Sequence, residues 1–142
     1  MQFNIKQTLL KGAEMVAEQK KILVVDDEES IRLAFKSILE NAGYLVETAG
    51  TGQEALEKAQ VKSYDVALID IELSDMDGTD LLLRLPRNSG MVKIIITGFS
   101  TVENGVKAAD CGADDYLVKP VEPRELLSAI KERLAVKVDE RL

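Results

Sequence analysis

Polar side chains that could do chemistry stand directly after short apolar runs at four places in the sequence. The carboxylates of Asp26, Asp27 and Asp70, the hydroxyl of Thr97 and the ammonium of Lys119 each fall at the end of such a run. If the runs are parallel strands of one sheet, their carboxyl ends share an edge, where open α/β sheets bind ligands. The sequence therefore predicts that these five side chains meet in one crevice.

Three of these side chains are carboxylates, which would repel one another in that crevice. At a separation of ~5 Å and an effective dielectric of ~20, each pair costs on the order of 3 kcal/mol. A divalent cation offsets this repulsion, and oxygen ligands suit Mg2+, or alternatively Mn2+, rather than zinc. Calcium fits less well, because the sequence shows no calcium-binding loop of the helix-loop-helix type.

A carboxylate in this setting can attack phosphorus and form an aspartyl phosphate. Lys119 could neutralise the added charge, and the Thr97 hydroxyl could bond a phosphoryl oxygen. Taken singly, each polar residue has an ordinary explanation as an acidic turn, a loop cap, a strand end or a surface charge. Their joint placement at strand ends favours a functional site.

The elements that must position these residues alternate along the chain. Strands are expected at residues 22–25, 45–48, 66–69, 92–96 and 116–118. Helices are expected between and after them. The first helix turns inward Ile31, Ala34, Phe35, Ile38, Leu39 and Ala42, and the second turns inward Ala55, Leu56 and Ala59. The third is marked by Leu81, Leu82 and Leu85, and the fourth carries Val102, Val106 and Ala109. The last helix buries Leu126, Leu127, Ile130 and Leu134. The alternation predicts an α/β fold with a doubly wound five-stranded parallel sheet of flavodoxin-like type, strand order 2-1-3-4-5.

The chain also divides into segments. Residues 1–19 lie outside the alternating pattern, and a shared helical face of Ile5, Leu9, Ala13 and Val16 predicts a partly helical N-terminal extension. It could pack on the domain or contact a partner. The main domain is predicted over residues 20–135, followed by a charged C-terminal tail at 136–142.

Composition excludes several classes of function. The net charge of −7 argues against direct binding of nucleic acid or of an anionic membrane. The chain has no histidine, so it cannot contain a Ser-His-Asp triad, a histidine-liganded zinc or a phosphohistidine of its own. The single cysteine, Cys111, is expected to be a small buried hydrophobe and fits a reducing, cytoplasmic location.

Four segments of the sequence resemble the receiver domain of two-component response regulators. They are ILVVDDEESIR, VALIDIELSDMDG, VKIIITG and GADDYLVKP, and the resemblance covers residues 21–134. It implies the receiver fold with Asp70 as the phospho-acceptor. It also implies that Asp27 ligates Mg2+ directly, that Asp26 assists, often through water, and that the main-chain carbonyl of Glu72 completes the protein ligands.

The resemblance further assigns a conformational switch. Thr97 and Tyr116 match the switch pair of the family, in which Thr97 turns toward the phosphoryl group and Tyr116 moves inward. The step from Lys119 to Pro120 matches a peptide bond that is commonly cis in the family. Ser74 and Gly98 depart from the commonest residues, proline and alanine, which predicts a less rigid loop and an open phosphoryl site.

The function implied is that of a phosphoprotein switch in a phosphorelay, carrying a 4-aspartylphosphate, and not that of a turnover enzyme. Its phosphoryl donor would be a histidine kinase or phosphotransfer protein, and its output an unidentified protein target, with a homodimer as a further option. Two alternatives stay open at this point: an aspartyl-phosphate phosphatase, and a flavin-binding protein of flavodoxin-like fold. The acidic turn after the first strand repels phosphate unless a metal intervenes, which disfavours the flavin protein.

Overall fold

A computed structural model of the chain describes residues 19–86 and 90–141, and side chains of that part up to residue 137. In chain order its elements are β1 (Lys21–Val25), α2 (Glu29–Asn41), β2 (Leu45–Ala49), α3 (Gly52–Val61), β3 (Val66–Ile69), α4 (Gly78–Arg84), β4 (Val92–Thr97), α5 (Val102–Asp110), β5 (Asp115–Val118) and α6 (Pro123–Arg141). The expected N-terminal helix lies outside the described residues.

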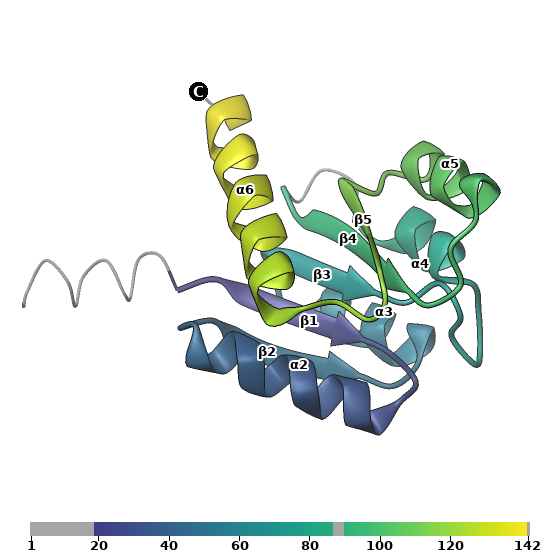
Figure 1. Cartoon of the computed structure of the whole chain (residues 1–142), viewed down its shortest axis with the longest axis horizontal. Coiled ribbons are helices and arrows are strands. Elements are labelled where there is room, and N and C mark those ends of the chain that lie inside the picture. Colours follow the sequence, from purple (N-terminus) through teal and green to yellow (C-terminus); the bar gives the residue numbers. More distant parts are fainter. Residues whose placement is uncertain (1–18, 87–89, 142) are drawn as a thin grey trace, which may run out of the picture.

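The strands form one parallel sheet of order β2-β1-β3-β4-β5, which confirms the predicted fold. The strand arrows in Figure 1 all point the same way, so the carboxyl ends gather along one edge. At that edge Val25 of β1 pairs with Ile69 of β3, and Thr97 of β4 pairs with Val118 of β5. The residues that follow these strands are therefore neighbours.

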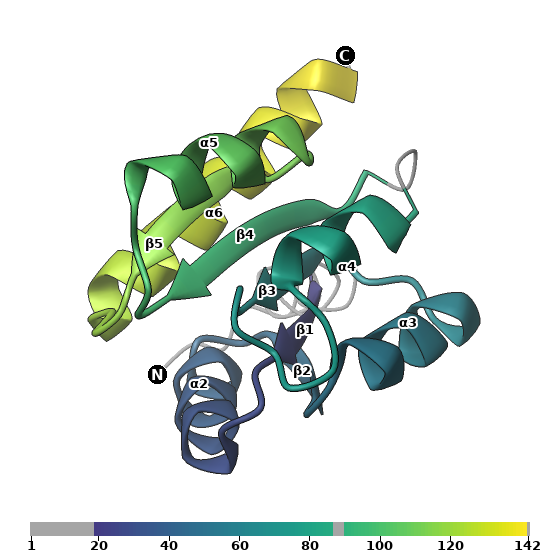
Figure 2. The same cartoon turned by 90° about the vertical axis from the view of Figure 1, so that its right-hand side faces the viewer.

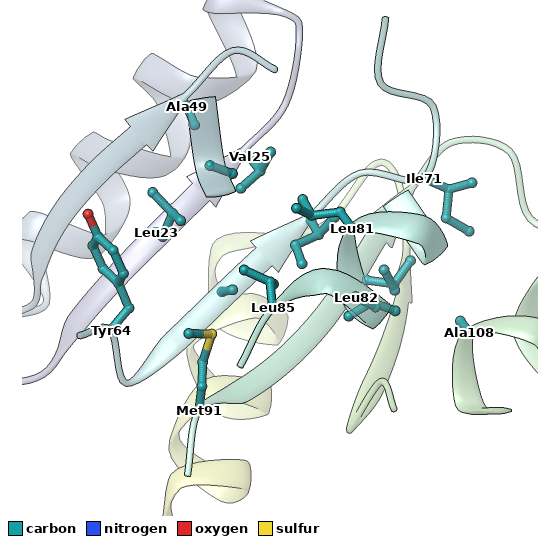
Figure 3. Packing of buried hydrophobic residues seen from close by; sticks show 14 residues of the cluster. Leu23, Val25, Ala49, Tyr64, Ile71, Leu81, Leu82, Leu85, Met91 and Ala108 are labelled. Atoms are coloured by element: carbon teal, nitrogen blue, oxygen red, sulfur yellow. The ribbon is translucent and has the colours of Figure 1, made fainter. Parts of the chain in front are cut away.

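Helices cover both faces of the sheet, and Figure 2 shows α2 and α3 on opposite sides of β1 and β2. One face packs against α3, α4 and α5 through a buried cluster that includes Leu23, Ile69, Leu81 and Ile95, seen from close by in Figure 3. The other face packs against α2 and α6 through a second cluster around Leu39 and Leu126. The central strands β3 and β4 are buried along their whole length, as expected of strands covered on both faces.

Side chains with oxygen acceptors start three of the helices. Thr51, Asp77 and Thr101 each accept a hydrogen bond from a backbone N–H in the first turn of α3, α4 and α5, respectively. Such caps satisfy donors that have no partner within the helix. The helices therefore begin just beyond the carboxyl ends of the strands and leave that edge to the loops.

The packing differs from the sequence expectation at a few helix positions. Ala34 of α2 and Ala42, which directly follows this helix, are exposed, although both were expected on the buried face. The helix that carries Val102 and Val106 is present, but both valines face solvent and Ala108 is the residue that packs on the sheet. A short helix can anchor through one small residue, which the apolar spacing did not reveal.

The last helix, α6, extends past the C-terminal boundary that the sequence predicts for the main domain. It runs continuously from Pro123 to Arg141 and so crosses the boundary expected at residue 135.

Within residues 19–86 and 90–141, none of the helices has the length and apolar character needed to cross a membrane.

Candidate functional site

The three predicted carboxylates meet at the carboxyl edge of the sheet. Asp26 and Asp27 directly follow β1, and Asp70 directly follows the adjacent strand β3. One carboxylate oxygen from each of the three lies within 4.8 Å of the others. Asp26 and Asp70 are buried, with 3% and 7% of their surface exposed, whereas Asp27 is open to solvent.

Lys119, which directly follows β5, completes the cluster. Its Nζ lies 2.7 Å from Oδ2 of Asp26 and 2.8 Å from Oδ2 of Asp70, so one ammonium bridges the two buried carboxylates. The backbone N–H of Lys119 also donates to the carbonyl oxygen of Thr97 at 2.9 Å. The bridge places the charge of Lys119 between two of the predicted metal ligands.

Burial and pairing set the protonation of this cluster. Burial raises the pKa of the Asp26 carboxyl above its ordinary value, and the bonds from Lys119 and from the Glu28 N–H oppose this only in part. Burial alone would lower the pKa of the Lys119 ammonium, but its bonds to Asp26 and Asp70 outweigh this and hold the pKa above its ordinary value. Lys119 therefore stays charged at neutral pH.

Backbone donors orient both buried carboxylates. The N–H of Glu28 donates to Oδ1 of Asp26 at 2.9 Å, and the N–H of Glu72 donates to Oδ1 of Asp70 at 3.1 Å. Each aspartate thus has one oxygen held by its own loop and the other held by Lys119. Glu72, whose carbonyl was expected to ligate the metal, lies in the loop that follows Asp70.

Thr97 and Tyr116, the expected switch pair, lie on neighbouring strands. Thr97 is buried at the end of β4, and its hydroxyl oxygen accepts a hydrogen bond from the N–H of Phe99 at 3.1 Å. Tyr116 pairs with Ile95 in the sheet and packs against the cluster under α4 and α5. Its hydroxyl is buried and has no hydrogen-bond partner among residues 19–86 and 90–141.

Gly98, where the sequence predicts an open phosphoryl site, is exposed and lies beside Lys119. A Cβ added at Gly98 would lie 3.9 Å from Cβ of Lys119, which is ordinary contact distance. Beside it, a groove of about 500 Å3 runs between the loop after β3 and the loop after β4 and is lined in part by Glu72, Met76, Phe99 and Asn104. The Phe99 side chain is exposed and forms part of this groove.

The donor set fits a small divalent cation. Asp26, Asp27 and Asp70 offer only oxygen ligands, within a distance that one ion can span. Hard cations that prefer oxygen, such as Mg2+ or Mn2+, suit such a set. The residues present therefore match the metal that the sequence predicted.

Sequence reasoning missed three residues that shape the site. Asp75 accepts hydrogen bonds from the N–H groups of Gly52 and Gln53, both at 2.9 Å, and so ties the loop after Asp70 to the start of α3. Arg32 donates from Nη1 to the carbonyl oxygen of Asp26 at 2.7 Å.

Gly78 is the third missed residue. A Cβ there would overlap the carbonyl oxygen of Asp70. The sequence showed this glycine only as the end of a loop.

Comparison with known proteins identifies the same kind of domain. Residues 22–131 match the family model of the response regulator receiver domain. Among curated relatives, the alkaline phosphatase synthesis transcriptional regulatory protein PhoP of Bacillus subtilis is 41% identical over 113 residues, which cover 79% of this chain and 47% of that protein. The transcriptional regulatory protein ZraR of Klebsiella oxytoca is 38% identical over 122 residues, which cover 85% of this chain and 28% of that protein. The chain thus spans at most about half the length of these relatives.

Solved structures agree in fold over nearly their whole length. A CheY-like receiver domain protein from Methanospirillum hungatei is 46% identical, with a TM-score of 0.83, and the match covers 86% of this chain and 98% of that one. A two-component response regulator from Clostridium difficile is 29% identical, with a TM-score of 0.79 and a coverage of 82% and 97%.

Proposed function

Because the chain belongs to the response regulator receiver domain family, we propose that it accepts a phosphoryl group on Asp70 from a histidine kinase or a phosphotransfer protein. Because the chain belongs to this family, we do not retain the two alternative functions, an aspartyl-phosphate phosphatase and a flavin-binding protein. The observation that supports Asp70 as the acceptor is the bridge from Lys119 to Asp26 and Asp70 beside a third carboxylate. Asp26 is buried and paired with Lys119 in the same way, so the match of Asp70 to the phospho-acceptor position of the family is what distinguishes the two carboxylates.

The proposed reaction is a displacement at phosphorus. An oxygen of the Asp70 carboxylate forms the new O–P bond while the N–P bond of the donor phosphohistidine breaks. The electron pair of that bond leaves with the imidazole nitrogen, which takes a proton from water when the ring would otherwise be anionic. The product is an acyl phosphate, and its later hydrolysis by water returns the carboxylate and inorganic phosphate.

The residues around Asp70 have complementary roles in this proposal. The Lys119 ammonium, which pairs with Asp70 before the reaction, is in position to meet the negative charge of the incoming phosphoryl oxygens. The Thr97 hydroxyl oxygen accepts a hydrogen bond from the N–H of Phe99, and its own O–H can donate to one of those oxygens. Tyr116, whose hydroxyl is buried, would respond to the movement of Thr97 through the adjacent strand.

Mg2+, or Mn2+ in its place, would be held by Asp26, Asp27 and Asp70 with the main-chain carbonyl of Glu72. When bound, such a cation would offset carboxylate repulsion and balance charge on the phosphoryl oxygens. The chain's own part is to keep these ligands on one edge, with Asp26 and Asp70 oriented by backbone N–H groups.

We expect the domain to act as a cytoplasmic switch that catalyses its own phosphorylation and slow dephosphorylation. Its curated relatives are transcriptional regulatory proteins that extend well beyond the matched region. The acidic charge of this chain argues that its own target is a protein, or a second copy of the chain, and not a nucleic acid.

Intact-mass spectrometry tests the assignment of Asp70. After incubation with acetyl phosphate and MgCl2, we expect a mass increase of one phosphoryl group that is removed by mild base or hydroxylamine. Asp70→Asn should lose the increase, whereas Asp80→Asn, an exposed aspartate on α4, should keep it. Persistence of the label on Asp70→Asn would reject Asp70 as the acceptor.

A further inference from the structure

Arg32 of α2 reaches back to the first turn of the site. Its Nη1 donates a hydrogen bond of 2.7 Å to the carbonyl oxygen of Asp26, six residues earlier in the chain. The side chain is half-buried at this position. A charged donor to a carbonyl makes a stronger bond than a neutral one, so this contact is well suited to fix the carbonyl in place.

The main chain of Asp26 is held from two sides. Its N–H donates to the carbonyl oxygen of Ala49 at 3.1 Å, which continues the ladder between β1 and β2 beyond the last strand residue. Its carbonyl accepts from Arg32. The peptide direction at the end of β1 is therefore set by one backbone bond and one side-chain bond.

The guanidinium is itself confined between two loops. A Cβ added at Gly50 would lie only 3.3 Å from Nη1 of Arg32, so the guanidinium lies against the backbone of Gly50. The N–H of Gly50 donates to Oε2 of Glu54 at 2.8 Å. That bond lowers the pKa of Glu54, and the charges of Lys58 and Arg32 lower it further, so an anion stands near the guanidinium. Arg32 is held by packing and charge in the orientation that serves Asp26.

The carbonyl that Arg32 holds belongs to the peptide bond between Asp26 and Asp27. Fixing that peptide fixes the direction of the N–Cα bond of Asp27, because the peptide unit is planar and ends at this Cα. The rotation about that bond and the side-chain torsions are then what remains free at Asp27. Asp27 is exposed, so burial does not confine its side chain as it confines Asp26. A fixed peptide at this turn therefore narrows the positions that the Asp27 carboxylate can take beside the other two.

We propose that Arg32 is a positioning residue for the cation site, acting through the peptide between Asp26 and Asp27. The inference rests on the proposed function, since it requires that these carboxylates bind Mg2+. The expected change in Mg2+ affinity is opposite in direction to what the charge of Arg32 alone would give. As a charge alone, Arg32 opposes a cation, so its removal would tighten Mg2+ binding; as a positioning residue, its removal weakens binding.

Isothermal titration with MgCl2 on the full chain separates these two outcomes. We expect Arg32→Gln to weaken Mg2+ affinity on the order of ten-fold, the range typical for residues that orient metal ligands. Arg84→Gln removes the same charge from an exposed position on α4 and should leave the affinity unchanged. Arg32→Lys keeps the charge and one donor but loses the planar fork, so its affinity should fall between those of wild type and Arg32→Gln.

Affinity of Arg32→Gln equal to or tighter than that of wild type would overturn the inference. Circular dichroism without metal reports whether the variant is folded, because a purely structural role would lower its melting temperature without changing the affinity of the folded fraction. If Arg32→Gln does not fold, Arg32→Lys decides, and a wild-type affinity in that variant overturns the inference. Failure of the wild type to bind Mg2+ would instead reject the proposed metal site itself.

Discussion

Replacing Lys119 with alanine tests the electrostatics of the site directly. In the structure the Lys119 ammonium lies within 2.8 Å of both Asp26 and Asp70, and both carboxylates are more than nine-tenths buried. Without the ammonium, these two groups face each other, with oxygens within 4.8 Å and no bridging cation between them. The variant should therefore be strained by repulsion when no metal is present.

The size of the effect follows from the geometry. At 4.8 Å and an effective dielectric of about 20, two unit charges repel by roughly 3.5 kcal/mol. Breaking a buried ion pair by removing one partner costs a similar amount, about 3–5 kcal/mol. Partial protonation of one carboxylate relieves some of this, so we expect a loss of about 2–4 kcal/mol at pH 7. For a chain of this size that is a fall of roughly 10 °C in melting temperature.

Mg2+ should reverse most of the loss. A ligand that binds only the folded state at about 100 times its Kd adds about 2.7 kcal/mol to stability. Because Lys119 and a cation compete for the same carboxylate oxygens, Lys119→Ala should also bind Mg2+ more tightly than wild type. Lower pH should stabilise the metal-free variant: a buried carboxyl with a raised pKa destabilises the fold when ionised, and this penalty disappears as pH falls through that pKa.

Thermal denaturation in EDTA and in MgCl2 measures these changes. Lys107→Ala is the matched control, because Lys107 is an exposed lysine whose contact with Asp77, at 3.8 Å, is worth little. If metal-free Lys119→Ala melts within about a degree of Lys107→Ala, the premise that Lys119 offsets a buried repulsion is wrong. Weaker Mg2+ binding in Lys119→Ala would refute the competition.

Three further changes test the loops and strands around the site. Gly78→Ala should lower the free energy of unfolding by about 2–4 kcal/mol in urea denaturation, since its Cβ would overlap the Asp70 carbonyl. Gly105→Ala in α5 has free space for its Cβ and should raise that free energy by about 0.5–1 kcal/mol. Equal urea midpoints for the two variants would contradict the close approach at Gly78. Asp75→Ala should cost about 1 kcal/mol of stability at pH 7, because the Asp75 carboxylate accepts hydrogen bonds from the N–H groups of Gly52 and Gln53. These bonds lower the pKa of Asp75, so the difference in stability between the variant and wild type should vanish as pH falls through that pKa. A difference that does not depend on pH would exclude this cap. Tyr116→Phe should leave stability unchanged or raise it by up to about 1 kcal/mol, and a clear loss in calorimetry would show that the hydroxyl has a partner after all.

The sheet and the meeting of Asp26, Asp27, Asp70 and Lys119 could be predicted because both follow from strand periodicity. Once Asp26, Asp70 and Thr97 are placed after parallel strands, the shared edge brings them together whatever the loops do. The Lys119 bridge follows in the same way from β5. These features depend on which residues end a strand, and that is written locally in the sequence.

The contacts of Arg32, Asp75 and Gly78 could not be predicted in the same way. Each joins a side chain or a missing Cβ to a backbone atom in another loop, so it depends on the path of that loop and not on periodicity. The outward valines of α5 escaped prediction for a related reason. Apolar spacing shows that a helix has an apolar face but not whether the fold covers it.

Charge balance indicates what Lys119 and the proposed divalent cation would each contribute to this site. Three carboxylates and one ammonium leave the cluster with two net negative charges, which one divalent cation would neutralise. A phosphoryl group on Asp70 replaces one negative charge with up to two. The added charge arrives on the oxygens nearest Lys119, so the ammonium that now bridges Asp26 and Asp70 should be drawn toward the phosphoryl group. Since the Lys119 N–H donates to the Thr97 carbonyl, such a shift would act on the carboxyl ends of β4 and β5, two residues beyond the pair of Ile95 and Tyr116.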